Sequence, residues 1–494
     1  MNTNIRRLAN VFLIIFLLVT IDLVYWQVID AGSLNSHAEN PRALITADHV
    51  LRGRIFDRNG MLLVGRRIYK SGFVQPFYTD PSLAQTLGYD SVNFGKTGLE
   101  SSLNSYLSGQ TGTSWKQTFN SWIHRPVRGD DVYLTIDERI QQAVVNALNN
   151  PTSLMLANSP NFSNLPVAVV VSDPRNGQVL AMVSKPYFDP TCLGSPDGAI
   201  ESRCEQSIAG QPNGPFVNRV LNGLYAPGST FKMVTLSAAL DSGVKSLSDQ
   251  FNGTAASGPI YVEGHQFGPT GNNLPAGVTS VDLLHAFMYS DNIVFAQVGL
   301  SLGAGRFLAY AHRFGLDQNI PFDLPVSVSH IRNPGQLFDR VALASSAFGQ
   351  GDDHVTPMQM LLVGEAIADH GTSPKPVLIK AIKTPAGTTV RGDSSGPLFS
   401  PISPSTSAQV VHAMSEVVNG GSGYYAQIPG VQVAGKTGTA EAGPGGPHAW
   451  FVAFAPAQDP RVAVAIIVEH GGEGAYVAAP LAQEILSAAL PLVH

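Results

Sequence analysis

The sequence predicts an α+β protein with three parts: an N-terminal transmembrane helix, a small extracytoplasmic module, and a larger domain in which helices flank a central antiparallel sheet. Three observations support this prediction. An apolar run lies close to the N-terminus, and the larger region has strand-like segments at both ends with helical segments between them. At 494 residues, the chain also exceeds what one hydrophobic core normally accommodates. Strands from distant segments that share one sheet, with helices packed on it, give an α+β layering.

The composition is that of a folded, loop-rich chain without a basic surface. Hydrophobic residues make up 44% of the chain and charged residues 13%, with 49 Gly and 34 Pro. The charged fraction lies well below the roughly 25% of an average soluble domain. The 30 Lys and Arg against 36 Asp and Glu give a net charge of −6. Since nucleic-acid binding depends on a basic surface, we expect no nucleic-acid partner.

The first element is a predicted membrane anchor over residues 8–29, preceded by a short tail over residues 1–7. Arg6 and Arg7 lie before the apolar run, whose one charged residue is Asp22. Such a run is long enough for a bilayer, which takes about 20 residues. The residues that follow it offer no small-x-small cleavage site, so we favour an uncleaved anchor over a cleaved signal peptide. The positive-inside rule places the tail in the cytoplasm and the chain from about Asp30 onward outside the membrane.

Residues 30–134 are predicted to form a small extracytoplasmic module, or pedestal. They mix Gly, Ser and Asn with short apolar runs and have few long periodic segments. The most specific stretch is Arg52–Gly60, where a strand pattern leads into Asn59-Gly60 before the apolar residues 61–64. An Asn-Gly pair between two strand patterns predicts a β-hairpin.

Residues 135–494 are predicted to form the second domain. Thr135 and Glu138 have the spacing of a capping box, and the apolar residues after them recur at helical spacing. A hairpin is expected over residues 167–183, with its turn at Pro174–Gly177. Further strands are expected at 431–434, 450–455 and 462–468, and a closing helix at about 480–490.

The two cysteines, Cys192 and Cys204, lie close together in a segment rich in turn residues. Outside the membrane such a pair can oxidise, so we predict a disulfide, with two separate thiols as the alternative. A zinc site would need more ligands than two cysteines. We therefore expect no metal and no cofactor.

Ser229 and Lys232 are the first candidate catalytic pair, at the start of an apolar segment with helical periodicity. At this spacing in a helix both side chains share one face, with Cβ atoms roughly 5–6 Å apart. A lysine whose pKa is lowered by burial or by a second cation can take the proton from a serine nucleophile. Alone the S-x-x-K pattern is weak, because a serine N-cap with a solvated lysine explains most chance occurrences.

Two further motifs make the combination specific. Ser290-Asp291-Asn292 and then Lys436-Thr437-Gly438-Thr439 follow in that order, and S-x-x-K with S-D-N and K-T-G is the signature of penicillin-binding proteins and class A β-lactamases. The sequence resembles class B penicillin-binding proteins over almost its whole length, most closely the small actinobacterial type with a short pedestal. The resemblance extends to Arg52–Gly60, Gly98–Glu100, Ala347–Gly351 and Val355–Gln359.

The resemblance implies catalytic roles for several residues of these motifs. Ser229 would be the acylated nucleophile and Lys232 its general base, while Ser290 would relay a proton to the leaving D-Ala amine. The backbone N–H groups of Ser229 and Thr439 would form the oxyanion hole. Asp291, between two functional residues, is expected to be structural.

The resemblance also implies how the substrate is bound. Asn292 would hold the amide of the donor peptide. The segment Lys436, Thr437, Gly438 and Thr439 would bind the terminal carboxylate or its β-lactam mimic, because a carboxylate requires a cation and hydroxyl donors.

The implied activity is that of a peptidoglycan D,D-transpeptidase acting in cell-wall synthesis and division. It would form an acyl-enzyme on Ser229 from a D-Ala-D-Ala stem peptide, pass the acyl group to an acceptor amine, and be inhibited covalently by β-lactams. Implied partners are stem peptides, β-lactams and a SEDS-type glycosyltransferase, against which Asp22 would dock the anchor. A D,D-carboxypeptidase uses the same residues, and a non-catalytic, β-lactam-binding division scaffold is the third hypothesis.

Three other features of the sequence suggest different sites or roles. Gly430–Thr437 matches the phosphate-loop pattern, but no suitable strand precedes it and no helix follows. Gly392–Pro397 resembles the serine region of trypsin-like proteases and is interpreted as a surface turn. His448 could line the site or be an ordinary histidine at its rim.

Class A β-lactamases clear their acyl-enzyme with a glutamate downstream of S-D-N. After Asp291 the first glutamate here is Glu365, in an apolar helical stretch and outside the expected loop pattern. The sequence therefore predicts a long-lived acyl-enzyme.

Overall fold

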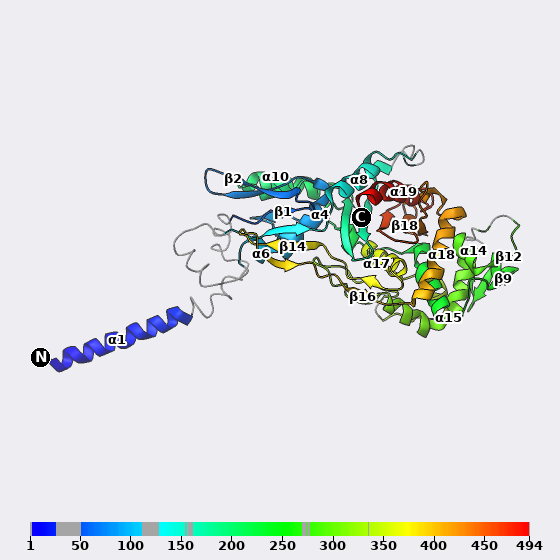
Figure 1. The fold of residues 1–494 in the computed structure, drawn as a ribbon. Helices are drawn as coiled ribbons and strands as arrows, with labels where there is room; N and C mark the ends of the chain where they lie inside the picture. The colour runs from blue at the N-terminus through cyan, green and yellow to red at the C-terminus, as the bar shows by residue number, and fades with distance from the viewer. Residues whose placement is uncertain are drawn as a thin grey trace.

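The computed structural model describes residues 2–25, 51–110, 128–153, 156, 162–268, 274, 277–333 and 335–493. Its first element is the helix α1 (Asn2–Val24). From residue 51 onward the described chain contains two larger sheets with helices around them (Figure 1). Residues 26–50, which include the end of the predicted anchor and the start of the predicted pedestal, lie outside the described residues, as do residues 111–127.

The pedestal is built on a six-stranded sheet in the order β15-β14-β6-β1-β2-β3. The predicted Asn-Gly hairpin is present, since β1 and β2 pair antiparallel with Ile55 opposite Val64. Two of the strands come from residues 379–392, so the sheet crosses the boundary predicted at residue 135. The strand bounds are β1 Ile55–Phe56, β2 Leu62–Ile68, β3 Val74–Tyr78, β6 Asp131–Leu134, β14 Ile379–Lys383 and β15 Thr389–Gly392.

A buried ion pair joins two pedestal segments that the resemblance singled out. Arg52 Nη2 lies 2.6 Å from Glu100 Oε2, and the Glu100 side chain is fully buried. Arg52 also lies 2.9 Å from Asp90. Because removing one partner would leave a buried charge uncompensated, the two segments depend on each other for their conformation.

The second sheet forms the centre of the larger domain and is antiparallel throughout, in the order β17-β18-β19-β7-β8. It joins strands from both ends of the domain, as predicted. Its strands are β7 Val167–Asp173, β8 Gln178–Lys185, β17 Ala434–Ala440, β18 His448–Ala455 and β19 Val462–Val468.

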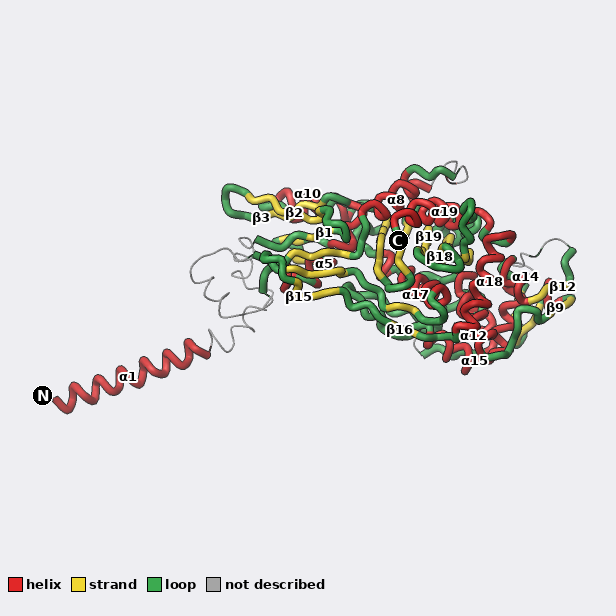
Figure 2. Tube along the Cα trace, in the orientation of Figure 1, coloured by secondary structure: helices red, strands yellow, loops and turns green. Residues whose placement is uncertain are grey.

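Helices cover both faces of this sheet. Every residue of β7 and β19 is buried; β19 is apolar throughout, and β7 is apolar up to Val171. Alternate residues contribute to two cores: Val169 packs on the side of α8 and α19, and Val170 packs in the larger core that includes α17. Figure 2 shows the helical region of α12, α14, α15 and α18 at one end of the molecule.

The principal helices are α8 Glu138–Asn149, α10 Gly198–Ala209, α12 Lys232–Asp241, α14 Leu283–Met288, α15 Asn292–Arg313, α16 Arg340–Ser346, α17 Pro357–Ala368, α18 Pro404–Gly420 and α19 Ala478–Ala489. Single-turn helices are α4 Ala84–Leu87, α5 Gly98–Ser102, α6 Asn104–Leu107, α11 Arg219–Asn222 and α13 Thr254–Ser257. The 3₁₀ segments include η2 Pro81–Leu83, η4 Pro190–Gly194, η5 Gly228–Phe231 and η6 Tyr424–Ala426. The short strands are β4 Asp90–Ser91, β5 Gly95–Lys96, β9 Gln250–Asn252, β10 Ile260–Val262, β11 His265–Phe267, β12 Ser280–Asp282, β13 Ser373–Pro374 and β16 Pro397–Phe399.

Two local predictions were wrong. The residue that caps α8 is Asp137, whose side chain accepts a hydrogen bond from Arg139 N, and not Thr135. The Thr135 hydroxyl donates instead to Val179 O and Val377 O, because β6 ends next to other buried strands. The strand predicted at 431–434 begins only at Ala434 and runs to Ala440.

Helix α15 is apolar and long enough to cross a membrane by length and composition, but half of its apolar window is buried inside the domain. Its first residue, Asn292, belongs to the S-D-N motif. Within the described residues α15 is therefore best explained as a core helix that positions the site.

Cys192, in η4, and Cys204, in α10, are joined in the structure with their Cα atoms 5.9 Å apart. The segment they close also contacts the pedestal, because the buried Glu201 of α10 accepts hydrogen bonds from Ser91 and Asn93. The cysteine pair thus lies where the larger domain meets the pedestal.

Candidate active site

Ser229 lies in the 3₁₀ turn η5, which leads directly into α12. Because the turn and the helix are continuous, Lys232 lies one turn after Ser229 on the same face. Its Nζ is 3.0 Å from Ser229 Oγ. Ser229 is partly exposed, whereas Lys232 is fully buried. The pair has the geometry of a nucleophile with its base.

The amine of Lys232 is the centre of a hydrogen-bond network. Its Nζ lies 2.7 Å from Ser290 O, 3.2 Å from Ser290 Oγ and 2.6 Å from Asn292 Oδ1. Burial, and then the charge of Lys436, hold the pKa of Lys232 well below its ordinary value, and Asp291 opposes this shift. A lowered pKa favours the neutral amine, which can accept a proton from Ser229.

Asp291 positions the S-D-N motif without reaching the cleft. Its side chain caps α15 by accepting hydrogen bonds from Ile293 N and Val294 N. Burial raises its pKa. The preceding residue, Ser290, has a φ of 63°. Non-glycine residues rarely adopt this conformation, which the surrounding structure must hold and which is found at functional sites.

Lys436 approaches the same serine from the sheet. It lies on β17, is fully buried, and its Nζ is 2.9 Å from Ser290 Oγ and 3.1 Å from Thr437 O. Burial lowers its pKa to about 7. Ser290 Oγ therefore lies between two lysine amines, in a position to carry protons between them.

The edge strand β17 lies against the nucleophile turn, and glycines allow this approach. A Cβ on Gly438 would lie 2.9 Å from side-chain atoms of Thr230 and Trp450, and one on Gly228 would lie 2.6 Å from Thr439 O. The carbonyl of Thr439 thus faces the turn. Since N–H and C=O of one strand residue point to the same side, the N–H of Thr439 is directed toward the turn as well.

These residues border a cleft of ≈ 770 Å³. Ser229, Ser290, Asn292, Thr437 and Thr439 line it, whereas Lys232, Gly438 and Lys436 lie beneath its surface. All eight site residues predicted from the sequence are therefore brought together. Thr437 Oγ1 lies 2.6 Å from Ser422 Oγ, and Thr439 Oγ1 accepts a hydrogen bond from Gly474 N.

Most of the walls of the cleft lie outside the three motifs and were not predicted from the sequence. They include strand β11 and the carboxylates of Glu441 and Glu473. Glu441 follows the K-T-G-T segment by two residues, which was a signal in the sequence. The remaining lining residues outside the motifs include His265, Gln266, Phe267, Tyr289, Ser345, Phe348, Gln350, Ser422 and Tyr476.

Two contacts fix the backbone before the nucleophile. Trp450 Nε1 donates to Ala226 O at 3.0 Å, and Gly228 N donates to Gly349 O at 2.9 Å. A Cβ on Gly349 would lie 1.9 Å from Gly228 O, so this glycine is required for the close contact. The segment Ala347–Gly351, noted for its family resemblance, therefore supports the nucleophile turn.

His448 is a rim histidine. It is not among the residues that line the cleft; its Nδ1 accepts a hydrogen bond from His470 N, and its ring packs edge-on against Tyr225. Burial, with the neighbouring His470, lowers its pKa. The phosphate-loop match is excluded as well, since Lys436 and Thr437 lie in a strand that pairs with β18.

Glu365 is also remote from the chemistry. It is fully buried in α17, accepts a hydrogen bond from Ser172 Oγ on β7, and does not line the cleft. Burial raises its pKa to about 8. Because it is buried outside the cleft, it cannot activate water at Ser229.

Comparison with known proteins gives a consistent family. Residues 167–487 match the penicillin-binding protein transpeptidase domain. The chain is 33% identical, over 99% of both chains, to the peptidoglycan D,D-transpeptidase PbpA of Mycolicibacterium smegmatis, and 31% identical, again over 99% of both chains, to PbpA of Mycobacterium tuberculosis.

Solved structures agree with these matches. Penicillin-binding protein A of M. tuberculosis, as its penicillin G acyl-enzyme complex, superposes with a TM-score of 0.80 at 31% identity, covering 89% of this chain and 100% of that one. The match includes the small N-terminal domain as well as the transpeptidase fold. The chain belongs to the class B penicillin-binding proteins, a family of serine D,D-transpeptidases.

Proposed function

We propose that this chain cross-links peptidoglycan by transferring the acyl group of a D-Ala-D-Ala stem peptide through Ser229 to the amine of a second stem peptide. The observation that carries the proposal is the contact between a partly exposed serine hydroxyl and a buried lysine amine, 3.0 Å apart. Burial and a second lysine hold the pKa of this lysine well below its ordinary value.

Acylation begins when Lys232 accepts the proton of Ser229 and the serine oxygen attacks the carbonyl of the penultimate D-Ala. The N–H groups of Ser229 and Thr439 stabilise the oxyanion. As the intermediate collapses, the proton passes from Lys232 to Ser290, which is 3.2 Å away, and on to the leaving D-Ala amine. In deacylation the acceptor amine follows the reverse route.

Strand β17 forms the wall of the cleft that binds the terminal carboxylate of the substrate. Asn292 holds the donor amide, and Thr437 and Thr439 offer hydroxyl groups to the terminal carboxylate. Lys436 adds positive charge from below Thr437, since its amine is buried. A β-lactam presents the same carboxylate and a strained amide, and therefore acylates Ser229.

The discriminating experiment mixes the full chain with a stem peptide that ends in D-Ala-D-Ala and with a second peptide that carries a free amine. Mass spectrometry then separates cross-linked dimer from hydrolysed monomer. We expect dimer and released D-Ala, both abolished by Ser229→Ala. Hydrolysed monomer alone would make the protein a carboxypeptidase, and neither product would favour a non-catalytic scaffold.

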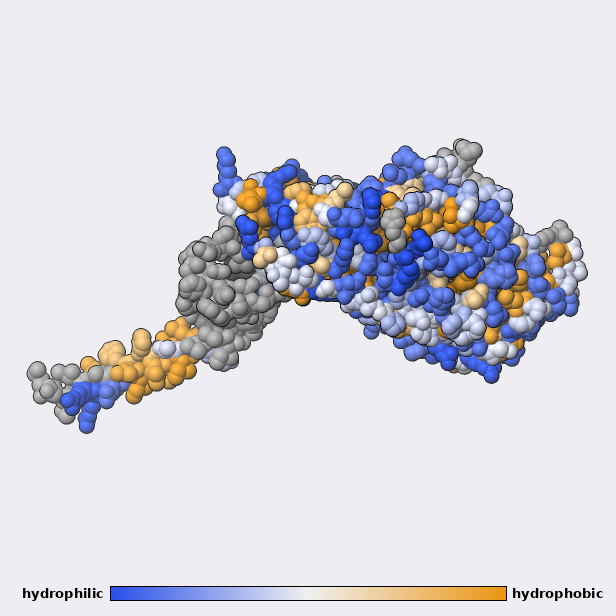
Figure 3. All heavy atoms as spheres, in the orientation of Figure 1, coloured by the Kyte–Doolittle hydropathy of each residue, from blue (hydrophilic) through white to orange (hydrophobic). Residues whose placement is uncertain are grey.

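The N-terminal helix is the proposed membrane anchor, with the catalytic domain outside the cell membrane. Helix α1 covers residues 8–24 of the predicted anchor 8–29, and as a continuous helix that anchor would be roughly 33 Å long, enough for a hydrocarbon core of about 30 Å. The face of this helix seen in Figure 3 is largely apolar. Its large apolar side chains are exposed, for example Phe12 at 66% and Phe16 at 75%.

Asp22 suggests a partner for this anchor, because an acid in a membrane helix is costly unless it faces protein or lies near the interface. The proposed partner is a polytopic glycosyltransferase of the SEDS type. Co-purification of the two proteins from membranes tests this, and Asp22→Leu should weaken it. Unchanged co-purification would leave proximity to the interface as the explanation.

A further inference from the structure

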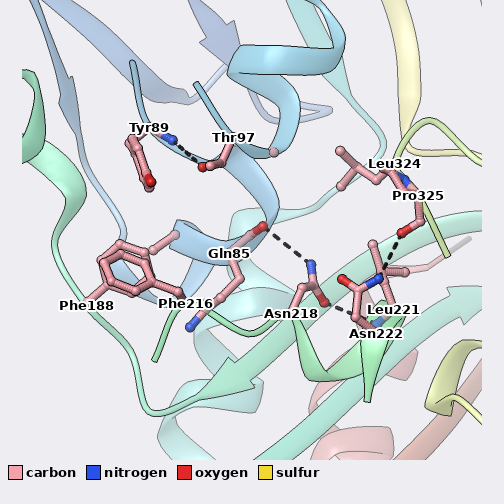
Figure 4. Close-up of a pocket in the computed structure, with 12 residues that line it drawn as sticks. Gln85, Tyr89, Thr97, Phe188, Phe216, Asn218, Leu221, Asn222, Leu324 and Pro325 are labelled. Carbon is pink, nitrogen blue, oxygen red and sulfur yellow. Dashed lines mark hydrogen bonds between the residues drawn. The ribbon is translucent and has the colours of Figure 1, made fainter. Parts of the chain in front are cut away.

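A second cavity, of ≈ 270 Å³, lies where the pedestal meets the larger domain (Figure 4). The pedestal contributes Gln85 and Tyr89, and the larger domain contributes Phe188, Phe216, Asn218 and Asn222. None of these residues belongs to the catalytic cleft. The segment from Asn218 continues along the chain to Ser229, so the cavity and the nucleophile share one stretch of backbone.

One wall of the cavity is aromatic. The rings of Phe188 and Phe216 lie 5.1 Å apart at 70°, and those of Tyr89 and Phe216 lie 6.1 Å apart at 62°. These edge-to-face contacts hold the rings in place. Phe216 nevertheless keeps 36% of its surface exposed, so part of a ring is available to a ligand.

The other wall consists of amides fixed by the protein. Asn218 Nδ2 lies 3.4 Å from Gln85 O, and its Oδ1 accepts a hydrogen bond from Leu221 N at 3.2 Å. Gln85 Nε2 donates to Pro186 O and Pro215 O. The half-buried Tyr89 side chain makes no hydrogen bond through its hydroxyl to any residue that the structure describes, and this leaves a donor and an acceptor for a ligand.

The charge of the walls restricts the ligand. Among the residues described, no Asp, Glu, Lys, Arg or His side chain lines the cavity. An anion or a cation would lose its hydration there without gaining a counter-charge. A neutral ligand with an apolar ring face and several hydroxyl or amide groups matches both walls, since the negative face of an aromatic ring attracts C–H groups.

We propose that this cavity binds an N-acetylated sugar of the glycan strand whose stem peptides the catalytic cleft processes. The inference rests on the proposed function for its choice of polymer. The C–H face of one pyranose ring packs on Phe216, and its hydroxyl and acetamido groups bond with Tyr89 and the amide wall. A glycan held here keeps its stem peptides near the enzyme between reactions.

The experiment titrates the full chain, in lipid nanodiscs, with N,N′,N″-triacetylchitotriose and with cellotriose, and measures heats of binding. We expect saturable binding of the acetylated trimer and at least about tenfold weaker binding of cellotriose, which has no acetamido groups. Phe216→Ala should weaken binding of the acetylated trimer by a similar factor. The matched control is Phe94→Ala, since Phe94 is 38% exposed and lies outside the cavity.

Benzylpenicillin separates this site from the catalytic cleft. Protein acylated beforehand should bind the acetylated trimer unchanged, and Phe216→Ala should acylate at the wild-type rate, which also verifies its fold. Absence of saturable binding, equal binding of cellotriose, equal loss in Phe94→Ala, or loss on prior acylation would each overturn the proposal. If benzylpenicillin does not acylate the wild-type protein at all, the proposed function fails, whether or not the acetylated trimer binds.

Discussion

Replacing Lys232 by methionine separates catalysis from stability. The change keeps the length of the side chain and removes the amine that lies 3.0 Å from Ser229 Oγ. General-base catalysis contributes about 10² to 10⁴-fold, so we expect the rate constant for acylation by benzylpenicillin to fall by that factor. The serine and the oxyanion hole stay in place, which leaves a slow residual reaction.

Stability should change little. Lys232 is fully buried beside Lys436, and burial lowers its pKa by penalising the charged form. Methionine avoids that penalty, while Ser290 O and Asn292 Oδ1 lose a donor, at about 1–3 kcal/mol each if they stay unpaired. The two effects oppose each other, so the melting temperature should stay close to that of the wild type.

The assay follows the acylated fraction over time by intact-mass spectrometry, from pH 5 to 9. In the wild type the rate should fall on acidification, because protonated Lys232 cannot accept the serine proton, and Lys232→Met should lose this dependence. The control is Lys245→Met, which removes a partly exposed lysine that pairs with Asp249. An acylation rate within tenfold of the wild type in Lys232→Met would refute the assignment of the base.

Three further predictions follow from individual residues. Glu365→Gln should flatten the pH dependence of stability. Burial raises the folded-state pKa of Glu365 to about 8, above its ordinary 4.5, so the wild type loses stability as the pH rises from about 4.5 to 8. Urea unfolding should show this loss as up to a few kcal/mol in the wild type and not in Glu365→Gln. Trp450→Phe should slow acylation without unfolding the protein, because Ala226 O loses its donor beside the nucleophile turn; an unchanged rate would show that this contact does not position the serine. The acyl-enzyme of the wild type should persist for many minutes after free drug is removed. It should persist equally in Glu441→Gln and Glu473→Gln. Rapid turnover of the drug by the wild type would instead mark a β-lactamase.

Most strands of the central sheet and the three catalytic motifs could be predicted, because both leave strong local signals in the sequence. Apolar runs such as Val462–Val468 predict buried strands, and three short motifs with specific chemistry predicted residues that meet in one network. The spacing of Ser229 and Lys232 predicts their contact directly, since residues three apart in a helical turn have neighbouring side chains.

Other features depend on contacts that spacing does not encode. The Thr135 capping box failed because a neighbouring strand offered its hydroxyl better acceptors, and Asp137 then capped the helix. The strand of residues 379–383 joins the pedestal sheet across more than two hundred residues of chain. The cavity between the two domains arises from segments that fold together only in three dimensions, so no local pattern indicated it.

The most direct measurement is peptide mapping of the full chain after reaction with benzylpenicillin. We predict one adduct per chain, on the peptide that contains Ser229, stable after the drug is removed, and no adduct in Ser229→Ala. An adduct that persists in Ser229→Ala, or that maps to a different residue, would contradict the account.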